Sequence, residues 1–135
     1  MLTCMDFRFF EQISKVMARA GLDGRYDHVI LAGAALGTVE PKVKHWHKTF
    51  FDHLKLAEDL HSIKAVIVLE HRDCGAYGPK GFGLLPAKPT REEERRVHFK
   101  QVAKLRKKIP PHLVFVADLM EKLERKAALT CDQLI

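Results

Sequence analysis

Short apolar runs alternate with amphipathic stretches along this chain of 135 residues. Residues 65–69 read AVIVL, a continuous apolar run rich in β-branched side chains. Such a run is typical of a strand buried on both faces of a parallel sheet. The first run begins almost at residue 1, so its strand is either very short or incomplete at its start. The expected strands are residues 2–5, 28–32, 65–69 and 113–117.

The segments between these strands carry helical signals. Apolar residues recur at helical spacing, and Gly21 is well placed just past the end of the first helix. Thr90 and Glu93 form a capping box that begins a later helix, which Pro110-Pro111 ends. The expected helices are residues 10–20, 43–57, 90 to the proline pair, and 119–129, with a loop rich in glycine and proline over residues 75–90.

Strands that alternate with helices predict an α/β fold of three layers. We expect a mainly parallel four-stranded sheet in the order 2-1-3-4, flanked by helices. A chain of 135 residues has room for one domain, so we expect residues 1–135 to form a single unit.

The composition places this domain in a broad class. Apolar residues make up 47% and charged residues 30% of the chain, as in ordinary globular proteins. No apolar stretch approaches the roughly 20 residues needed to cross a bilayer. The start, MLTCMDFRFF, lacks the basic region and apolar run of a secretory signal. We therefore expect a cytoplasmic protein with reduced cysteines and no membrane partner.

The net charge of +6 could indicate a nucleic-acid partner. However, acids are interspersed with the bases, as in residues 91–96, REEERR. The densest basic run, residues 104–108, closes an expected helix, where cations suit the negative end of the helix dipole. We expect no nucleic-acid partner, and a mild attraction for small anions instead.

Two segments with potential metal ligands follow two of the expected strands. Cys4 lies in CMDFR after the first strand, and His71 and Cys74 lie in HRDCG after the third. Ligands of open parallel sheets bind beyond the carboxyl ends of the strands. If these strands are neighbours, about 4.8 Å apart, the three side chains can converge. Two thiolates and one imidazole suit Zn²⁺, and three protein ligands leave a fourth position for water, as in catalytic zinc sites.

Each of these residues also has a simpler interpretation. A single buried cysteine commonly packs as a small apolar residue, and Asp6 with Arg8 could be an ordinary surface ion pair. Both motifs in one chain, each after an expected strand, favour metal ligation for Cys4 and Cys74. Cys131 has no partner motif and is interpreted as a plain thiol.

The remaining histidines show no partner in the sequence, and we assign none of them to the site. Any of them could relay protons near neutral pH. They include His45, His47, His53, His61, His98 and His112.

The pair of motifs resembles the two zinc-binding signatures of the β-class carbonic anhydrases, C-x-D-x-R and H-x-x-C-G. This chain supplies them as CMDFR at residues 4–8 and HRDCG at residues 71–75. The apolar strand before His71 and the AGA segment at residues 32–34 lie where that family has comparable features. The resemblance covers roughly residues 2–118.

The resemblance implies a zinc ion bound by Cys4, His71 and Cys74, with Asp6 and Arg8 as a dyad beside the open coordination position. In that family, the aspartate paired to arginine accepts a hydrogen bond from zinc-bound water. The implied activity is the reversible hydration of CO₂ to bicarbonate by zinc-bound hydroxide, a lyase reaction. The resemblance also suggests a homodimer or higher homo-oligomer with the pocket at or near the interface.

Some positions depart from the family's pattern. Phe7 stands where the family usually has serine, and residues 30–34 read ILAGA where it usually has R-N-A-G-N. These changes make the expected pocket more apolar. Two alternatives therefore stay open: a related zinc hydrolase acting on carbonyl sulfide or carbon disulfide, and a non-catalytic zinc-binding protein.

Overall fold

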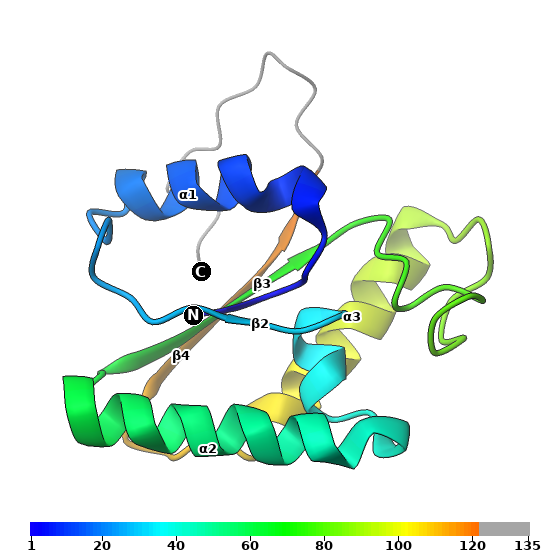
Figure 1. The fold of residues 1–135 in the computed structure, drawn as a ribbon. Coiled ribbons are helices and arrows are strands. Elements are labelled where there is room, and N and C mark those ends of the chain that lie inside the picture. The colour runs from blue at the N-terminus through cyan, green and yellow to red at the C-terminus, as the bar shows by residue number, and fades with distance from the viewer. Residues whose placement is uncertain (122–135) are drawn as a thin grey trace.

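The computed structural model of the chain describes residues 1–121, which form a four-stranded parallel sheet (Figure 1). The strand order is β2-β1-β3-β4, and every neighbouring pair is parallel. This arrangement confirms the α/β fold and the strand order predicted from the sequence. The strands are β1 (Leu2–Thr3), β2 (Val29–Ile30), β3 (Ala65–His71) and β4 (Val114–Met120).

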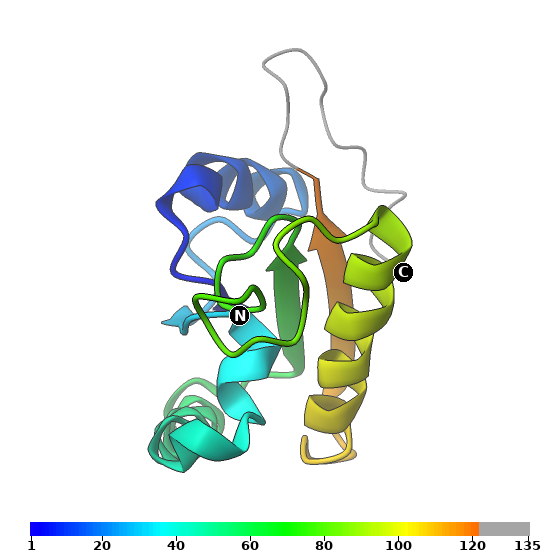
Figure 2. The same cartoon turned by 90° about the vertical axis from the view of Figure 1, so that its right-hand side faces the viewer.

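Helices cover both faces of the sheet. Figure 1 shows α1 above the strands and α2 below them, and Figure 2 shows α3 alongside β4. Three short 3₁₀ turns, η1, η2 and η3, complete the connections. The helical elements are η1 (Phe7–Phe9), α1 (Phe10–Arg19), η2 (Ala34–Thr38), η3 (Pro41–Val43), α2 (Lys44–His61) and α3 (Arg91–Arg106).

The alternation of side chains along β3 divides the core into two clusters. Val66 and Val68 belong to the cluster that contains residues of α2 and α3. Leu69 points to the opposite face and packs in the cluster formed with α1. Because successive side chains of a strand point to opposite faces, Glu70 and His71 lie on different sides of the sheet. His71 faces α1 and Glu70 faces α3.

The start of α3 is held by the capping box that the sequence predicts. The Glu93 backbone N–H donates to Thr90 Oγ1 at 3.2 Å, and the Thr90 N–H donates to Glu93 Oε2 at 2.7 Å. Such a cap stabilises a helix by about 1 kcal/mol. It also fixes where this helix begins. Glu94 and His98 lie one turn apart on its buried face.

Two expectations for individual elements need correction. The helix expected from residue 119 does not begin there, because β4 continues to Met120. Leu119 and Met120 are buried and pair with Glu70 and His71 at the end of β3. The rest of that expected helix, and Cys131, lie outside the described residues. The strands β1 and β2 are also shorter than expected, at two residues each.

Within residues 1–121, none of the helices combines the length and the apolar character needed to cross a membrane.

Candidate metal centre

The side chains of Cys4, His71 and Cys74 converge at one end of the sheet. Cys4 follows β1, His71 ends β3, and Cys74 lies in the turn after it. Because β1 pairs in parallel with β3, both strands end at the same edge. The three ligand atoms lie within 4.8 Å of one another, and all three residues are buried. This geometry confirms the predicted convergence, and the group could hold a metal ion.

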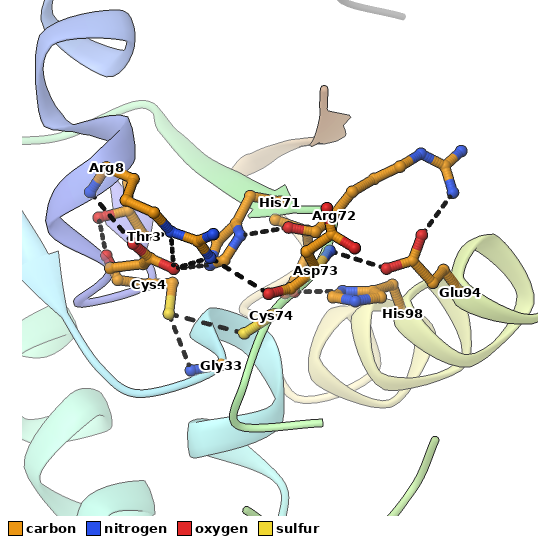
Figure 3. Close-up of polar contacts among 12 residues, drawn as sticks. Thr3, Cys4, Arg8, Gly33, His71, Arg72, Asp73, Cys74, Glu94 and His98 are labelled. Atoms are coloured by element: carbon orange, nitrogen blue, oxygen red, sulfur yellow. Dashed lines mark hydrogen bonds and ion pairs between the residues drawn. The ribbon is translucent and has the colours of Figure 1, made fainter. Parts of the chain in front are cut away.

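The spacing of the two sulfur atoms fits tetrahedral metal coordination. Cys4 Sγ and Cys74 Sγ are 3.7 Å apart, and Figure 3 shows them pointing toward each other. Two sulfurs that each lie about 2.3 Å from a tetrahedral Zn²⁺ would be about 3.8 Å apart. The same spacing also suits a hydrogen bond between a thiol and a thiolate.

The His71 ring is oriented for ligation through Nε2. Its Nδ1 donates a hydrogen bond to the Arg72 carbonyl at 2.8 Å, which fixes the tautomer. Its Nε2 is buried and has no hydrogen-bond partner within the part of the chain that the structure describes. Phe9 packs against the ring with centroids 4.3 Å apart. A buried ring nitrogen without a partner is destabilising unless a ligand occupies it, so this atom supports the fit to a metal.

The surroundings of Cys4 favour the thiolate that a metal requires. The Cys74 thiol donates to Cys4 and is the main cause of its lowered pKa, which His71 and the Gly33 backbone N–H lower further against the effect of burial. Gly33 N lies 3.3 Å from Cys4 Sγ. The Cys4 thiolate and burial together raise the pKa of Cys74. Because a metal needs both sulfurs deprotonated, metal binding would release the Cys74 proton.

The charge on Cys4 also acts on His71. Burial alone would lower the pKa of His71, but the neighbouring Cys4 thiolate, the Arg72 carbonyl and Asp6 together raise it. The site therefore pairs a thiolate with an imidazole that binds a proton more readily than usual. A bound cation would replace that proton.

Asp6 and Arg8 form a close ion pair next to the ligands. Arg8 Nη2 donates to Asp6 Oδ2 at 2.5 Å, and Arg8 Nε donates to Oδ1 at 2.9 Å. Hydrogen bonds from Arg8 are the main cause of the low pKa of Asp6, about 2, so its carboxylate is ionised at neutral pH. Asp6 Oδ2 is also 3.8 Å from His71 Nε2. The carboxylate therefore lies directly beside the ligand atoms.

The turn that carries Cys74 is held by a second set of charged groups. Asp73 has a positive φ of 55°, which is uncommon for a residue with a side chain. Glu94 of α3 accepts a hydrogen bond from the Asp73 N–H at 2.7 Å and another from Arg72 at 3.1 Å (Figure 3). Arg8 donates to the Asp73 carbonyl at 3.2 Å. Hydrogen bonds to Glu94 and from Arg8 therefore hold both backbone polar groups of Asp73.

A buried polar cluster lies on the opposite face of β3 from His71. It consists of Glu70, Tyr77 and His98, none of which is more than 2% exposed. This cluster was not predicted from the sequence, in which His98 shows no partner. The sequence contains one indication of the cluster. Glu70 directly follows the apolar run of residues 65–69, a position at which a side chain of a central strand is expected to be buried.

Other histidines contact groups outside the metal site. The sequence alone shows no partner for these side chains, but in the structure each of the four makes a polar contact, that of His53 within its own helix. The pairs are His47 with the Glu40 carbonyl, His53 with the Thr49 carbonyl, His61 with Asp27, and His112 with Glu58.

A pocket of about 370 Å³ opens beside Cys74. The loop between Cys74 and α3 forms most of its wall, and Lys80 and Glu94 contribute charge. Its lining does not include Asp6, Arg8 or His71.

No family model matches the chain, and neither does any solved structure. The chain is 39% identical over 107 residues to an uncharacterized protein of Rickettsia bellii, a match that covers 79% of this chain and 64% of that relative. Another uncharacterized protein, from Rickettsia conorii, is 39% identical over 77 residues, which are 57% of this chain and 41% of the relative. The chain thus spans less than two thirds of the length of these relatives.

Proposed function

We propose that the chain is a zinc-dependent lyase that interconverts CO₂ and bicarbonate, in the manner of the β-class carbonic anhydrases. The observation that carries this proposal is the position of the Asp6–Arg8 pair beside three convergent ligands. A structural zinc site closes all four coordination positions with protein ligands, whereas three ligands leave one position open for chemistry. The residues that would hold the ion are Cys4, His71 and Cys74.

A zinc ion in this site would lower the pKa of a water molecule toward ~7 and so supply a nucleophile for CO₂ at neutral pH. The residues of the chain have separate tasks. Asp6 is kept ionised by Arg8, so its carboxylate can only accept hydrogen bonds. It would orient the nucleophile by accepting a hydrogen bond from the nucleophile's O–H group. Arg8 holds the carboxylate with two side-chain nitrogens and limits its rotation. His71 keeps its ligand atom aimed at the site through its bond to the Arg72 carbonyl.

Carbonyl sulfide or carbon disulfide is a second candidate substrate, favoured by the apolar residues on either side of Asp6. Met5 is 65% exposed and Phe7 is 81% exposed. Both molecules are linear and CO₂-like, but they are less polar than bicarbonate. A related hydrolase would use the same ligands and the same dyad.

The proposal is tested by measuring bound metal and CO₂ hydration on the same reduced protein. We expect about one zinc per chain. We also expect the rate to fall by two orders of magnitude or more in Asp6→Asn, with zinc retained. Asp52→Asn is the matched control, because Asp52 pairs with Lys48 on the surface of α2. Stoichiometric zinc without activity on CO₂, carbonyl sulfide or carbon disulfide would leave only the non-catalytic zinc protein.

We further propose a homodimer that works in the cytoplasm on a small molecule, with no nucleic-acid or membrane partner. Exposed apolar side chains near the ligands, those of Met5, Phe7 and Phe10, support self-association. Sedimentation of the wild type and of Phe7→Glu tests the oligomeric state. We expect a dimer for the wild type and a weaker dimer for the variant.

A further inference from the structure

We infer that Glu70, Tyr77 and His98 form a positioning cluster. Its hydrogen bonds hold the segments around Cys4, His71 and Cys74 in fixed positions relative to one another. This inference deepens the proposed function, because it rests on a metal bound by Cys4, His71 and Cys74. It assigns a role to residues that do not touch the metal or the substrate.

The Glu70 carboxylate accepts three hydrogen bonds in the core. Its Oε1 accepts from the Ala35 backbone N–H at 2.8 Å. Its Oε2 accepts from the Tyr77 hydroxyl at 3.1 Å and from His98 Nδ1 at 2.8 Å. Tyr77 stacks on the His98 ring with centroids 3.7 Å apart, which fixes both donors.

The segments of His71 and Cys74 are tied directly to this carboxylate, and the segment of Cys4 is tied to it through the Gly33 turn. Glu70 itself precedes His71 on β3. Ala35 lies two residues after Gly33, whose N–H donates to Cys4 Sγ. Tyr77 belongs to the turn that begins at Cys74, since its N–H donates to the Cys74 carbonyl at 3.1 Å. One side chain therefore connects the surroundings of all three ligands.

The chemistry of the cluster argues against a role in packing alone. Burial of a carboxylate is unfavourable, and a well-packed apolar side chain usually serves the core at least as well. Glu70 is 2% exposed and its ion-pair partner is the His98 ring, not a lysine or arginine. Burial and the nearby Glu70 carboxylate raise the pKa of Tyr77, so its hydroxyl keeps the proton that it donates. Loss of a hydrogen bond made directly to a metal ligand typically changes metal affinity by about 10–100-fold, and Glu70 acts one step further out, on the segments that carry or contact the ligands.

His98 anchors the cluster to α3. Its ring is fully buried, and its Nε2 has no hydrogen-bond partner among the described residues. Among the described residues, the ring therefore makes its hydrogen bond to Glu70 through Nδ1. Through it, the helix that also carries Glu94 is linked to the ligand segments.

The test compares metal binding by four variants of the full chain. Glu70→Ala removes the acceptor. In Glu70→Gln the amide oxygen can still accept from the Ala35 N–H, while the amide nitrogen lies beside His98. Tyr77→Phe deletes one donor and keeps the stacked ring. Leu105→Ala is the control, because it empties a buried apolar position two turns after His98 on the same helix and removes none of the hydrogen bonds to Glu70.

Zinc affinity is measured by competition with a chromogenic chelator, well below each variant's unfolding temperature. The site geometry is read from the absorption spectrum of the Co²⁺-loaded protein. We expect Glu70→Ala to bind zinc about 10–100-fold more weakly with an altered thiolate-to-cobalt band. Glu70→Gln should recover most of the affinity, and Tyr77→Phe should lose a few-fold. Leu105→Ala should keep wild-type affinity and spectrum.

Unchanged affinity and spectrum in Glu70→Ala would overturn the inference, as would an equal loss in Leu105→Ala. If Glu70→Ala does not fold, Tyr77→Phe decides the matter, and wild-type affinity in that variant overturns the inference. Failure of the proposed function is separate, because it is read from CO₂ hydration by the wild type. A wild type that binds no zinc overturns both.

Discussion

The backbone N–H of Gly33 donates to the sulfur of Cys4 across 3.3 Å, so a turn after β2 contacts a ligand after β1. Gly33 has a positive φ of 73°, in the region that favours glycine. A Cβ added to Gly33 would lie 3.1 Å from the Cβ of Ala76, which lies in the turn that begins at Cys74. Gly33 therefore lies between the segments of the two cysteine ligands.

Gly33→Ala should weaken both the fold and the metal site. The left-handed backbone alone costs about 1 kcal/mol for a residue with a Cβ, and contact with Ala76 would shift the N–H away from Cys4. Gly21→Ala is a matched control, because Gly21 has a φ of 70° but no atom within 4 Å of the added Cβ. Urea denaturation should show a loss of stability in both variants. Zinc competition should show a loss of affinity in Gly33→Ala alone, and equal affinities would contradict this prediction.

Arg8→Ala should raise the pKa of Asp6 from about 2 toward its ordinary value, because the hydrogen bonds from Arg8 hold it down. A carboxyl group with a lowered pKa in the folded state stabilises the fold above its unfolded pKa of about 3.9. That contribution is lost as the pH falls toward 2, so wild type and variant should differ in stability at pH 5 and converge near pH 2. NMR titration of the Asp6 carboxyl carbon measures the pKa.

A matched variant for this experiment is Lys15→Ala. Lys15 forms an exposed ion pair with Glu11 on α1, away from the ligands. The Asp6 titration should be unchanged in this variant. An Asp6 pKa that stays near 2 in Arg8→Ala would show that another group controls it.

Removal of the metal should lower the unfolding temperature. A ligand that binds only the native state, at about 100 times its dissociation constant, adds about 2.7 kcal/mol of stability. Thermal unfolding with and without a chelator measures the difference. Cys4→Ser and Cys74→Ser should abolish the response to chelator. Cys131→Ser should keep it, and a lost response in that variant would place Cys131 among the ligands.

Glu94→Ala should destabilise the turn that carries Cys74. The change leaves the Asp73 N–H and Arg72 without their buried acceptor, which costs about 1–3 kcal/mol. Glu92→Ala, at an exposed position of the same helix turn, should change stability by less than about 0.5 kcal/mol. Chemical denaturation monitored by circular dichroism compares the two. Similar small losses in both would mean that Glu94 does not support the strained Asp73.

The strands and the candidate ligands at their ends could be predicted because each depends on a local pattern. The apolar run of β3 and the polar residues directly after it are neighbours in sequence, so the location of His71 follows from the strand alone. The position of Cys4 beside them then requires only that β1 and β3 pair in parallel. His71 and Cys4 are thus both located by the end of the strand that precedes or carries them.

The polar cluster behind the site could not be predicted, because it depends on contacts between distant segments. Glu70 and His98 are 28 residues apart, and their contact requires the rotation of α3 about its axis. The sequence pattern of this highly charged helix shows only weakly which of its faces is buried. The extension of β4 to Met120 has a similar cause, since pairing with β3 overrides the local pattern.

The position of β1 between β2 and β3 has a consequence for biosynthesis. Cys4 and Cys74 are 70 residues apart in the chain. At a synthesis rate of about 5–20 residues per second, the first thiol is made several seconds before the second. A zinc finger can capture its ion from ligands close together in sequence. An ion held by Cys4, His71 and Cys74 would be captured only when β1, the Gly33 turn and β3 have come together, so its loading would follow the pairing of segments that are distant in the chain.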